Sequence, residues 1–169
     1  DLAWYVAPDA SRDTLFAAIE HLTPNARLGE KFQYQNFMYM TAGMVVEAVA
    51  GKSWEAYIQA NVLGPLEMTT TNFLVPSDEA DLTTVNAALP YGWKDDAFEL
   101  EDFYNITAMG PAGSIRSNAK EMSHWLQMLL AGGEYGDQAL LGEQELHYLM
   151  SNHSSFGSYP AKTDQVTLG

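Results

Sequence analysis

Apolar residues recur at three- and four-residue spacing in several stretches of the chain, which places them on one face of a helix. The first stretch follows Ser11, a residue type favoured at helix N-caps, and ends before Pro24. Its apolar positions are Leu15, Phe16, Ile19 and Leu22. The pattern predicts a short amphipathic helix that ends before the proline.

Two more helices are predicted on either side of Gly51, a residue type that commonly ends helices. The first has Asn36 in the N-cap position, and its apolar positions are Tyr39, Met40, Met44, Val45 and Val49. The second begins after Ser53 and ends at Gly64-Pro65. Its apolar stripe consists of Trp54, Tyr57, Ile58 and Val62.

The C-terminal half predicts two further helices after a turn at Gly110-Pro111-Ala112-Gly113. One has Ser117 as its N-cap and closes at Gly132-Gly133. Its apolar positions are Met122, Trp125, Leu126, Leu129 and Leu130. The last spans Glu143 to Met150, with Leu146, Leu149 and Met150 expected to point inward.

The helical period fails between Asn72 and Asn105. Aromatic and apolar residues around Lys94-Asp95-Asp96 predict a β-hairpin there, and these residues are Tyr91, Trp93, Phe98 and Leu100. No series of alternating strands and helices is present to build a large sheet. The predicted fold class is therefore mainly α with a small β-hairpin, with residues 1–150 as a helical domain and residues 151–169 as a polar loop.

Composition narrows the classes of function. At 169 residues and 47% hydrophobic, the chain can form a core, and its formal charge of −14 would repel nucleic acid and anionic membranes. The longest apolar stretches, such as Met44 to Ala50, fall far short of the roughly 20 residues of a membrane span. The absence of Cys and the scattered positions of four His residues predict no metal site, and no cofactor is expected. The start at Asp1 and the polar tail predict a piece of a longer protein.

An ordered series of short motifs runs from Leu28 to Met150. It comprises Phe32-Gln33-Tyr34-Gln35-Asn36, Tyr39, Gly43, Val45-Val46-Glu47, Gly51-Lys52-Ser53, Pro65-Leu66-Glu67-Met68-Thr69-Thr70-Thr71, Gly110-Pro111-Ala112-Gly113-Ser114-Ile115-Arg116-Ser117 and Leu129-Leu130-Ala131-Gly132-Gly133. In order and spacing it resembles the serine β-lactamase family, which includes class C β-lactamases, penicillin-binding proteins and family VIII esterases. Three residues depart from the family pattern and leave the substrate class open: Gln35, Glu67 and Ser114 stand where the family has a small residue, a Gly and a Gly.

The resemblance implies the helical domain of the β-lactamase/transpeptidase-like fold, without most of its α/β sheet. It also implies that Tyr34 and Asn36 are catalytic residues of a serine hydrolase that forms an acyl-enzyme on β-lactams, D-Ala-D-Ala peptides or esters. The partners implied are a small-molecule or peptide substrate and the remaining α/β domain of the same protein. For the parent protein, the family implies a periplasmic or extracellular location, which the residues themselves leave open.

The chemistry of Tyr34 and Asn36 fits such a role. Residues two apart in an extended segment point to the same side, so both side chains can face one cavity. A phenol with a pKa of about 10 relays a proton at neutral pH only beside a cation such as lysine, while an asparagine amide can position a substrate carbonyl. Judged by residue type alone, a buried Tyr and a helix-capping Asn are the competing interpretation.

The nucleophile of this family is the Ser of a Ser-x-x-Lys motif on a helix before the Tyr-x-Asn segment, and none of the 33 residues before Tyr34 fits it. Ser117-Asn118-Ala119-Lys120 matches the spacing but is interpreted as a helix cap, and Lys162-Thr163-Asp164 as loop. The chain alone is therefore expected to be inactive. The alternatives are a non-catalytic binding or regulatory module and a structural domain of an assembly. The aromatic residues Tyr91, Trp93, Phe98, Phe103 and Tyr104 either line the cleft or form the core of a small domain.

Overall fold

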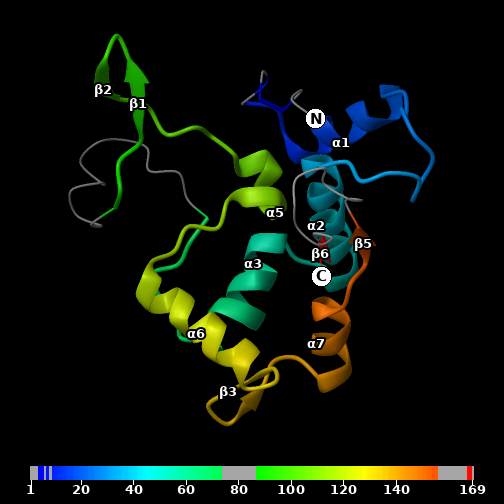
Figure 1. The fold of residues 1–169 in the computed structure, drawn as a ribbon, viewed down its shortest axis with the longest axis vertical. Coiled ribbons are helices and arrows are strands. Elements are labelled where there is room, and N and C mark those ends of the chain that lie inside the picture. The colour runs from blue at the N-terminus through cyan, green and yellow to red at the C-terminus, as the bar shows by residue number, and fades with distance from the viewer. Residues whose placement is uncertain (1–3, 6, 8, 74–86, 156–166, 169) are drawn as a thin grey trace, which may run out of the picture.

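The computed structural model describes residues 4, 5, 7, 9–73, 87–155 and 167–168, and Figure 1 shows their arrangement. Helix α1 (Arg12–Ala18) continues into the 3-10 turn η1 (Ile19–His21). The Ser11 hydroxyl accepts a hydrogen bond from the Thr14 amide at 3.1 Å, as an N-cap does. The prediction of a capped helix that ends before Pro24 is confirmed.

Helix α2 (Asn36–Ala50) ends at Gly51, which has a left-handed φ of 65°. Helix α3 (Trp54–Ile58) follows, capped by the Ser53 hydroxyl, and its last turn widens into the π-helical turn η2 (Gln59–Leu63). The predicted pair of helices around Gly51 is confirmed. The N-cap of α2 is Gln35 rather than Asn36, because the longer Gln35 side chain reaches forward and accepts from the Phe37 amide at 3.2 Å.

The segment predicted as a turn at residues 110–113 is instead one helical turn, α5 (Gly110–Gly113), which follows the 3-10 turn η3 (Thr107–Met109). Helix α6 (Ala119–Leu130) is capped by Asn118, whose Oδ1 accepts from the Glu121 amide at 3.0 Å. The predicted cap, Ser117, was wrong by one residue. Its hydroxyl is hydrogen-bonded to that of Thr71 at 2.7 Å instead.

Helix α7 (Glu143–Met150) has the predicted bounds but contains no buried residue. Leu149 is 54% and Met150 62% exposed, so the expectation that both point inward was wrong. Leu146 is half-buried. Amphipathic spacing predicts a helix and its apolar face, but it does not supply the element that covers this face.

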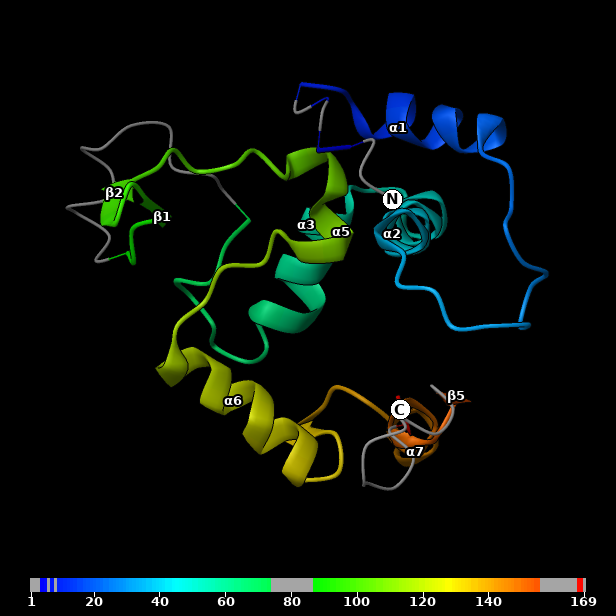
Figure 2. The same cartoon turned by 45° about the horizontal axis from the view of Figure 1, so that its top comes forward.

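The predicted hairpin is present as β1 (Tyr91–Lys94) and β2 (Ala97–Leu100), with Trp93 opposite Phe98. Asp95 and Asp96 have φ of 48° and 60°, as a two-residue hairpin turn requires. The hairpin projects away from the helices in both Figure 1 and Figure 2. Two shorter antiparallel pairs were not predicted: β3 (Glu134–Tyr135) with β4 (Gln138–Ala139), and β5 (Ser154–Ser155) with β6 (Thr167–Leu168). The fold class, mainly α with small antiparallel strand pairs, is confirmed.

Two small cores hold the helices together. One joins α1, α2 and η3, and its buried residues are Leu15, Phe37, Met40 and Met109. The other joins η2, the segment that follows it and α6, and its buried residues are Leu63, Leu66, Met68 and Met128. Trp54, 7% exposed, lies between them: its ring packs edge-on against Phe73 and also lies close to Gly43 of α2. Among the described helices, none is long and apolar enough to cross a membrane.

Candidate functional site

The Tyr34-Gln35-Asn36 segment lies where the chain enters α2, and buried residues fix its position. Phe37 is 1% exposed and Met40 is fully buried, so the first turn of α2 is held in the N-terminal core. Gln35 has φ −149° and ψ 103°, an extended conformation that directs the residues on either side of it to the same side of the backbone. This is the backbone geometry assumed when Tyr34 and Asn36 were assigned to one cavity.

Tyr34 is 72% exposed, so the buried-tyrosine interpretation is wrong. Within the described residues, no hydrogen bond joins its hydroxyl to another group. The cation that would favour its phenolate is therefore not in contact with it in the part of the chain that the structure describes. Asn36 opens the helix but does not cap it. The catalytic roles of Tyr34 and Asn36 remain predictions.

Several serine hydroxyls elsewhere in the described structure bond to the backbone or to neighbouring side chains. Ser11 and Ser53 cap helices, and Ser114 donates to the Gly110 carbonyl at 3.1 Å. Ser117 is the serine that matches the Ser-x-x-Lys spacing. Its hydroxyl bonds to that of Thr71, and within the described part of the chain no hydrogen bond joins it to Lys120. The interpretation of this sequence as a structural element holds, although the residue that caps α6 is Asn118. Ser77 and Lys162-Thr163-Asp164 lie outside the described residues.

A Ser-His pair at the end of α7 has the spacing of a nucleophile and a base but the wrong protonation for that role. The Ser151 hydroxyl lies 3.3 Å from His153 Nε2, and the same nitrogen lies 2.6 Å from the Tyr148 carbonyl. A carbonyl only accepts, so Nε2 carries the proton and cannot take one from Ser151. Ser151 itself donates to the same carbonyl at 2.7 Å. The pair terminates the helix.

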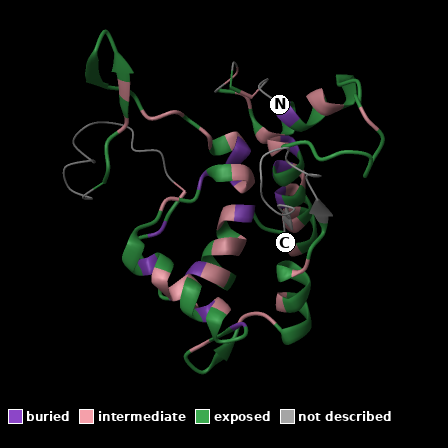
Figure 3. Cartoon of the chain, viewed as in Figure 1, coloured by how far each residue is buried: buried purple, intermediate pink, exposed green. Residues whose placement is uncertain are grey.

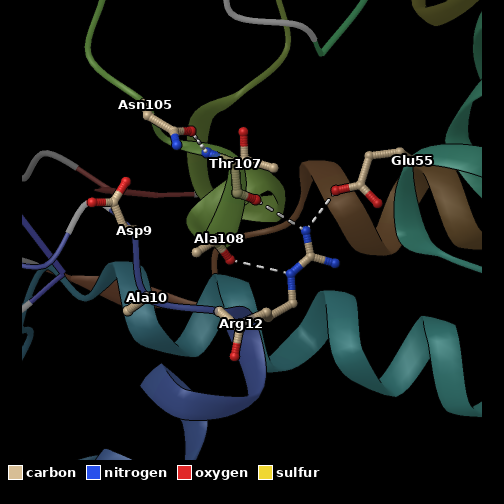
Figure 4. Close-up of a pocket in the computed structure, with 8 residues that line it drawn as sticks. Asp9, Ala10, Arg12, Glu55, Asn105, Thr107 and Ala108 are labelled. Atoms are coloured by element: carbon tan, nitrogen blue, oxygen red, sulfur yellow. Dashed lines mark hydrogen bonds and ion pairs between the residues drawn. The ribbon is translucent and has the colours of Figure 1, made fainter.

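A shallow cavity of about 470 Å³ at the start of α1 also serves structure (Figure 4). Arg12 lines the cavity, and its guanidinium bonds to three other elements. Nη1 lies 2.6 Å from Glu47 of α2, and Nη2 lies 2.5 Å from Glu55 of α3. Nε donates to the Ala108 carbonyl at 3.1 Å. One guanidinium thus joins α1, α2, α3 and η3. Four of its five N–H groups bond to protein groups, so contacts within the fold occupy most of the guanidinium.

Glu121 of α6 is a buried carboxylate, 6% exposed, that the sequence analysis did not identify. Burial alone would raise its pKa, but hydrogen bonds from the amides and hydroxyls of Thr70 and Thr71 outweigh burial and lower the pKa to about 2. A perturbed pKa often marks a reactive group. Here all the donors that lower the pKa belong to Thr70 and Thr71, the residues that Glu121 binds to α6. The carboxylate therefore has a structural role.

The hairpin aromatics do not form the core of a small domain, since Tyr91, Trp93 and Phe98 are 56%, 63% and 72% exposed. Their role in lining a cleft remains a prediction. Arg116 lies over the Phe103 ring, 4.7 Å from its centroid, and burial lowers the pKa of its guanidinium. Tyr104 stacks on Tyr5, and burial, with the charge of Tyr5 as a second cause, raises the pKa of Tyr104. No group of three potential metal ligands occurs among the described residues.

Comparison with known proteins places this arrangement in a family. The sequence profile of the family described as Beta-lactamase matches residues 1–167. The chain belongs to the Beta-lactamase family. The resemblance inferred from the ordered motifs is thereby confirmed.

A putative D-alanyl-D-alanine carboxypeptidase of Escherichia coli K12 is 23% identical over 133 residues, which cover 69% of this chain and 30% of that protein. Protein flp of Staphylococcus aureus N315 is 26% identical over 106 residues, covering 60% of this chain and 20% of that protein.

Solved structures show the Beta-lactamase-family fold. The octameric penicillin-binding protein homologue from Pyrococcus abyssi aligns with a TM-score of 0.69 and 23% identity, over 90% of this chain and 32% of that one. The D-amino acid amidase from Ochrobactrum anthropi SV3 aligns with a TM-score of 0.66 and 17% identity, over 85% and 41%. The chain thus spans between 20% and 41% of the length of these four relatives.

Proposed function

We propose that this chain is the helical, site-flanking part of a serine hydrolase in which Tyr34 relays a proton and Asn36 positions the substrate carbonyl. The serine and its lysine come from the remainder of the protein. The whole protein would act in the periplasm or outside the cell. The observation that carries the proposal is the exposed Tyr34 held at the entrance to α2 by the buried Phe37 and Met40. An exposed phenol with no partner among the described residues is available to a group supplied from elsewhere in the protein.

The reaction class follows from the family. A covalent acyl-enzyme on a β-lactam, a D-alanyl peptide or an ester needs an activated serine. The hydroxyls of Ser11, Ser53, Ser114 and Ser117 bond to the backbone or to a threonine instead, which supports a nucleophile from elsewhere in the protein. The chain alone should therefore fold without being acylated, and the complete protein should be acylated. Its relatives include a putative D-alanyl-D-alanine carboxypeptidase and a D-amino acid amidase. They support peptides and amides of D-amino acids as the first substrate class to test.

The test compares Tyr34→Phe with Tyr148→Phe in the complete protein, using acylation by a fluorescent penicillin as the readout. Both tyrosines are well exposed, at 72% and 67%, and both changes remove only a hydroxyl. Tyr34→Phe should slow acylation by roughly 10² to 10⁴, the usual loss of a general acid-base group, and Tyr148→Phe should not. Wild-type rates in both variants, or a complete protein without a Ser-x-x-Lys motif, would favour a non-catalytic module derived from the same fold.

A further inference from the structure

The β1-β2 hairpin carries four large apolar side chains on one face. Its register pairs Tyr91 with Leu100 and Trp93 with Phe98. Paired residues of an antiparallel sheet, and residues two apart on one strand, point to the same face, so these four side chains share a face. We call Tyr91, Trp93, Phe98 and Leu100 the aromatic face of the hairpin.

The aromatic face is open to solvent. All residues from 93 to 102 are exposed, and the hairpin is almost entirely green in Figure 3. The Trp93 and Phe98 rings meet edge-on with their centroids 4.9 Å apart, a favourable geometry for an aromatic pair that orders the face. A two-stranded hairpin has little stability of its own, and contiguous exposed apolar side chains commonly mark a binding surface. The aromatic face therefore has the character of a surface that another molecule covers.

The charge of the hairpin selects among possible partners. Residues 91–102 include one basic side chain, Lys94, which lies 3.8 Å from Glu99. The acidic side chains of this segment number five, and they are Asp95, Asp96, Glu99, Glu101 and Asp102. Together with the formal charge of −14 on the whole chain, this surplus repels nucleic acid, an anionic membrane and a second copy of the chain. It attracts a partner that carries positive charge.

The rings favour the same kind of partner. An ammonium or guanidinium group is attracted to the face of an aromatic ring, most strongly to that of Trp. Trp and Tyr are also among the residues that contribute most to binding at protein interfaces. Because Trp93 and Tyr91 are 63% and 56% exposed, such a group can reach their rings. Charge and ring chemistry therefore both point to Lys or Arg side chains on the partner.

The free edges of the hairpin determine how such a partner is held. Within the described residues, β1 and β2 pair with each other and with no further strand, so each has an edge without a neighbouring strand. An extended peptide can add to an edge of this kind through main-chain hydrogen bonds, and every second side chain of the peptide then lies on one face. We propose that an extended basic segment of a partner protein adds beside β1, with Lys or Arg side chains against the rings of Tyr91 and Trp93.

This interaction is separate from the chemistry proposed at Tyr34. Figure 1 and Figure 2 both show the hairpin at one side of the molecule, apart from α2 and the segment that enters it. The hairpin would recruit the protein to a basic partner whether or not Tyr34 relays a proton.

Fluorescence anisotropy of a labelled peptide tests the proposal on the polypeptide translated from the complete reading frame. The probe is a heptapeptide of alternating Lys and Thr, blocked at both ends. It should bind the wild type, whereas the same peptide with Gln in place of Lys should not. Trp93→Leu keeps an apolar side chain and the net charge but removes the ring, so it should weaken binding roughly three- to tenfold, and Trp93→Phe should retain most of the affinity. Tyr148→Leu is the control, because it removes a similarly exposed ring on α7, 67% against 63%, and it should bind as the wild type does.

Five results would overturn the proposal. Unchanged binding by Trp93→Leu would reduce the attraction to net charge, and a loss in Trp93→Phe as large as in Trp93→Leu would exclude the ring as the binding group. Binding of the Gln peptide at similar strength would identify an apolar occupant. Displacement of the probe by lysine amide at the same lysine concentration would identify a site for a small cation. A wild type that does not bind the Lys peptide would leave the hairpin without a basic partner.

Discussion

The amide and the hydroxyl of Thr71 both donate to Oε2 of Glu121, at 2.8 and 2.5 Å. Thr70 supplies the same two groups to Oε1, each at 2.8 Å. Four hydrogen bonds thus satisfy a carboxylate that is 6% exposed and fix the segment after η2 to the first turn of α6. Both oxygens of Glu121 can accept all four bonds only when the carboxylate is ionised. The strength of this contact therefore depends on pH.

Acid should weaken the fold through Glu121. Its pKa is about 2 in the fold and 4.5 ordinarily, so the unfolded chain binds the proton more tightly and the contribution to stability is present above pH 4.5. As pH falls from 4.5 to 2, a contribution on the order of 3 kcal/mol is lost. Urea unfolding of the chain at intervals between pH 7 and pH 2 measures this loss.

Glu121→Gln isolates this group from the other acidic residues. The free energy of unfolding of the variant should be about 1 to 3 kcal/mol lower at pH 7. The reason is that the amide nitrogen of Gln, itself a donor, would face two donors of a threonine. Its stability should then fall less steeply with acid than that of the wild type. Parallel stability curves for the two proteins would show that Glu121 is not the titrating group.

Asn118 should matter more than Ser117 at the start of α6. Asn118 accepts from the Glu121 amide and also donates to the Thr70 hydroxyl at 2.9 Å. Asn118→Ala should therefore cost about 1 to 2 kcal/mol, as expected for a lost N-cap. Ser117→Ala removes a single bond to the Thr71 hydroxyl and should cost about 1 kcal/mol or less. Unfolding free energies from urea titration rank the two variants, and a larger cost for Ser117→Ala would restore it as the cap.

Gly43 should resist a substitution that usually stabilises helices. A Cβ at this position of α2 would overlap the Pro111 ring of α5, so the two helices would have to separate. Gly43→Ala should destabilise by about 1 to 3 kcal/mol, whereas Gly to Ala in an open helix position normally gains about 1 kcal/mol. Gly113→Ala is the control, since its Cβ would lie 3.5 Å from Ile106 in ordinary contact. A gain in thermal stability for Gly43→Ala would contradict the packing of α2 on α5.

Local signals explain why the helices were predictable. Ser11, Gly51 and Ser53 act through bonds and dihedral angles within three or four residues, which the sequence contains in full. The Asp95-Asp96 turn was found for the same reason. The cap of α6 was misplaced because Thr71, 46 residues earlier, binds the Ser117 hydroxyl, and contacts at that separation leave no local pattern.

In the candidate site, too, the residues that belong to local motifs were predictable and those with distant partners were not. Tyr34 and Asn36 were found through ordered motifs, and the extended Gln35 between them follows from its position at the start of a helix. Arg12 and Glu121 were missed, since their partners at residues 47, 55, 70 and 71 are brought to them by the fold. Neither residue has a spacing signal of its own. Val45 and Val49 were assigned to the apolar face of α2, yet they are 57% and 84% exposed, because periodicity does not say what covers a face.

Glu67 occupies a backbone position that glycine would fill at lower cost. Its φ is 56°, in the left-handed region where a Cβ is strained, and the family pattern has Gly at this point of the Pro-Leu-Gly-Met motif. The neighbours leave it no alternative conformation: Leu66 is fully buried, Met68 is 2% exposed, and the Glu67 amide donates to the Gly64 carbonyl at 2.9 Å. Glu67→Gly should therefore raise the free energy of unfolding by about 1 kcal/mol, less the entropy that glycine adds to the unfolded chain.

Glu67→Ala is the matched control, since it removes the same negative charge but keeps the Cβ, and it should give little or none of the gain. The comparison is made by urea unfolding at one pH and ionic strength. Equal gains in both variants would assign the effect to charge repulsion in a chain of net charge −14 rather than to backbone strain.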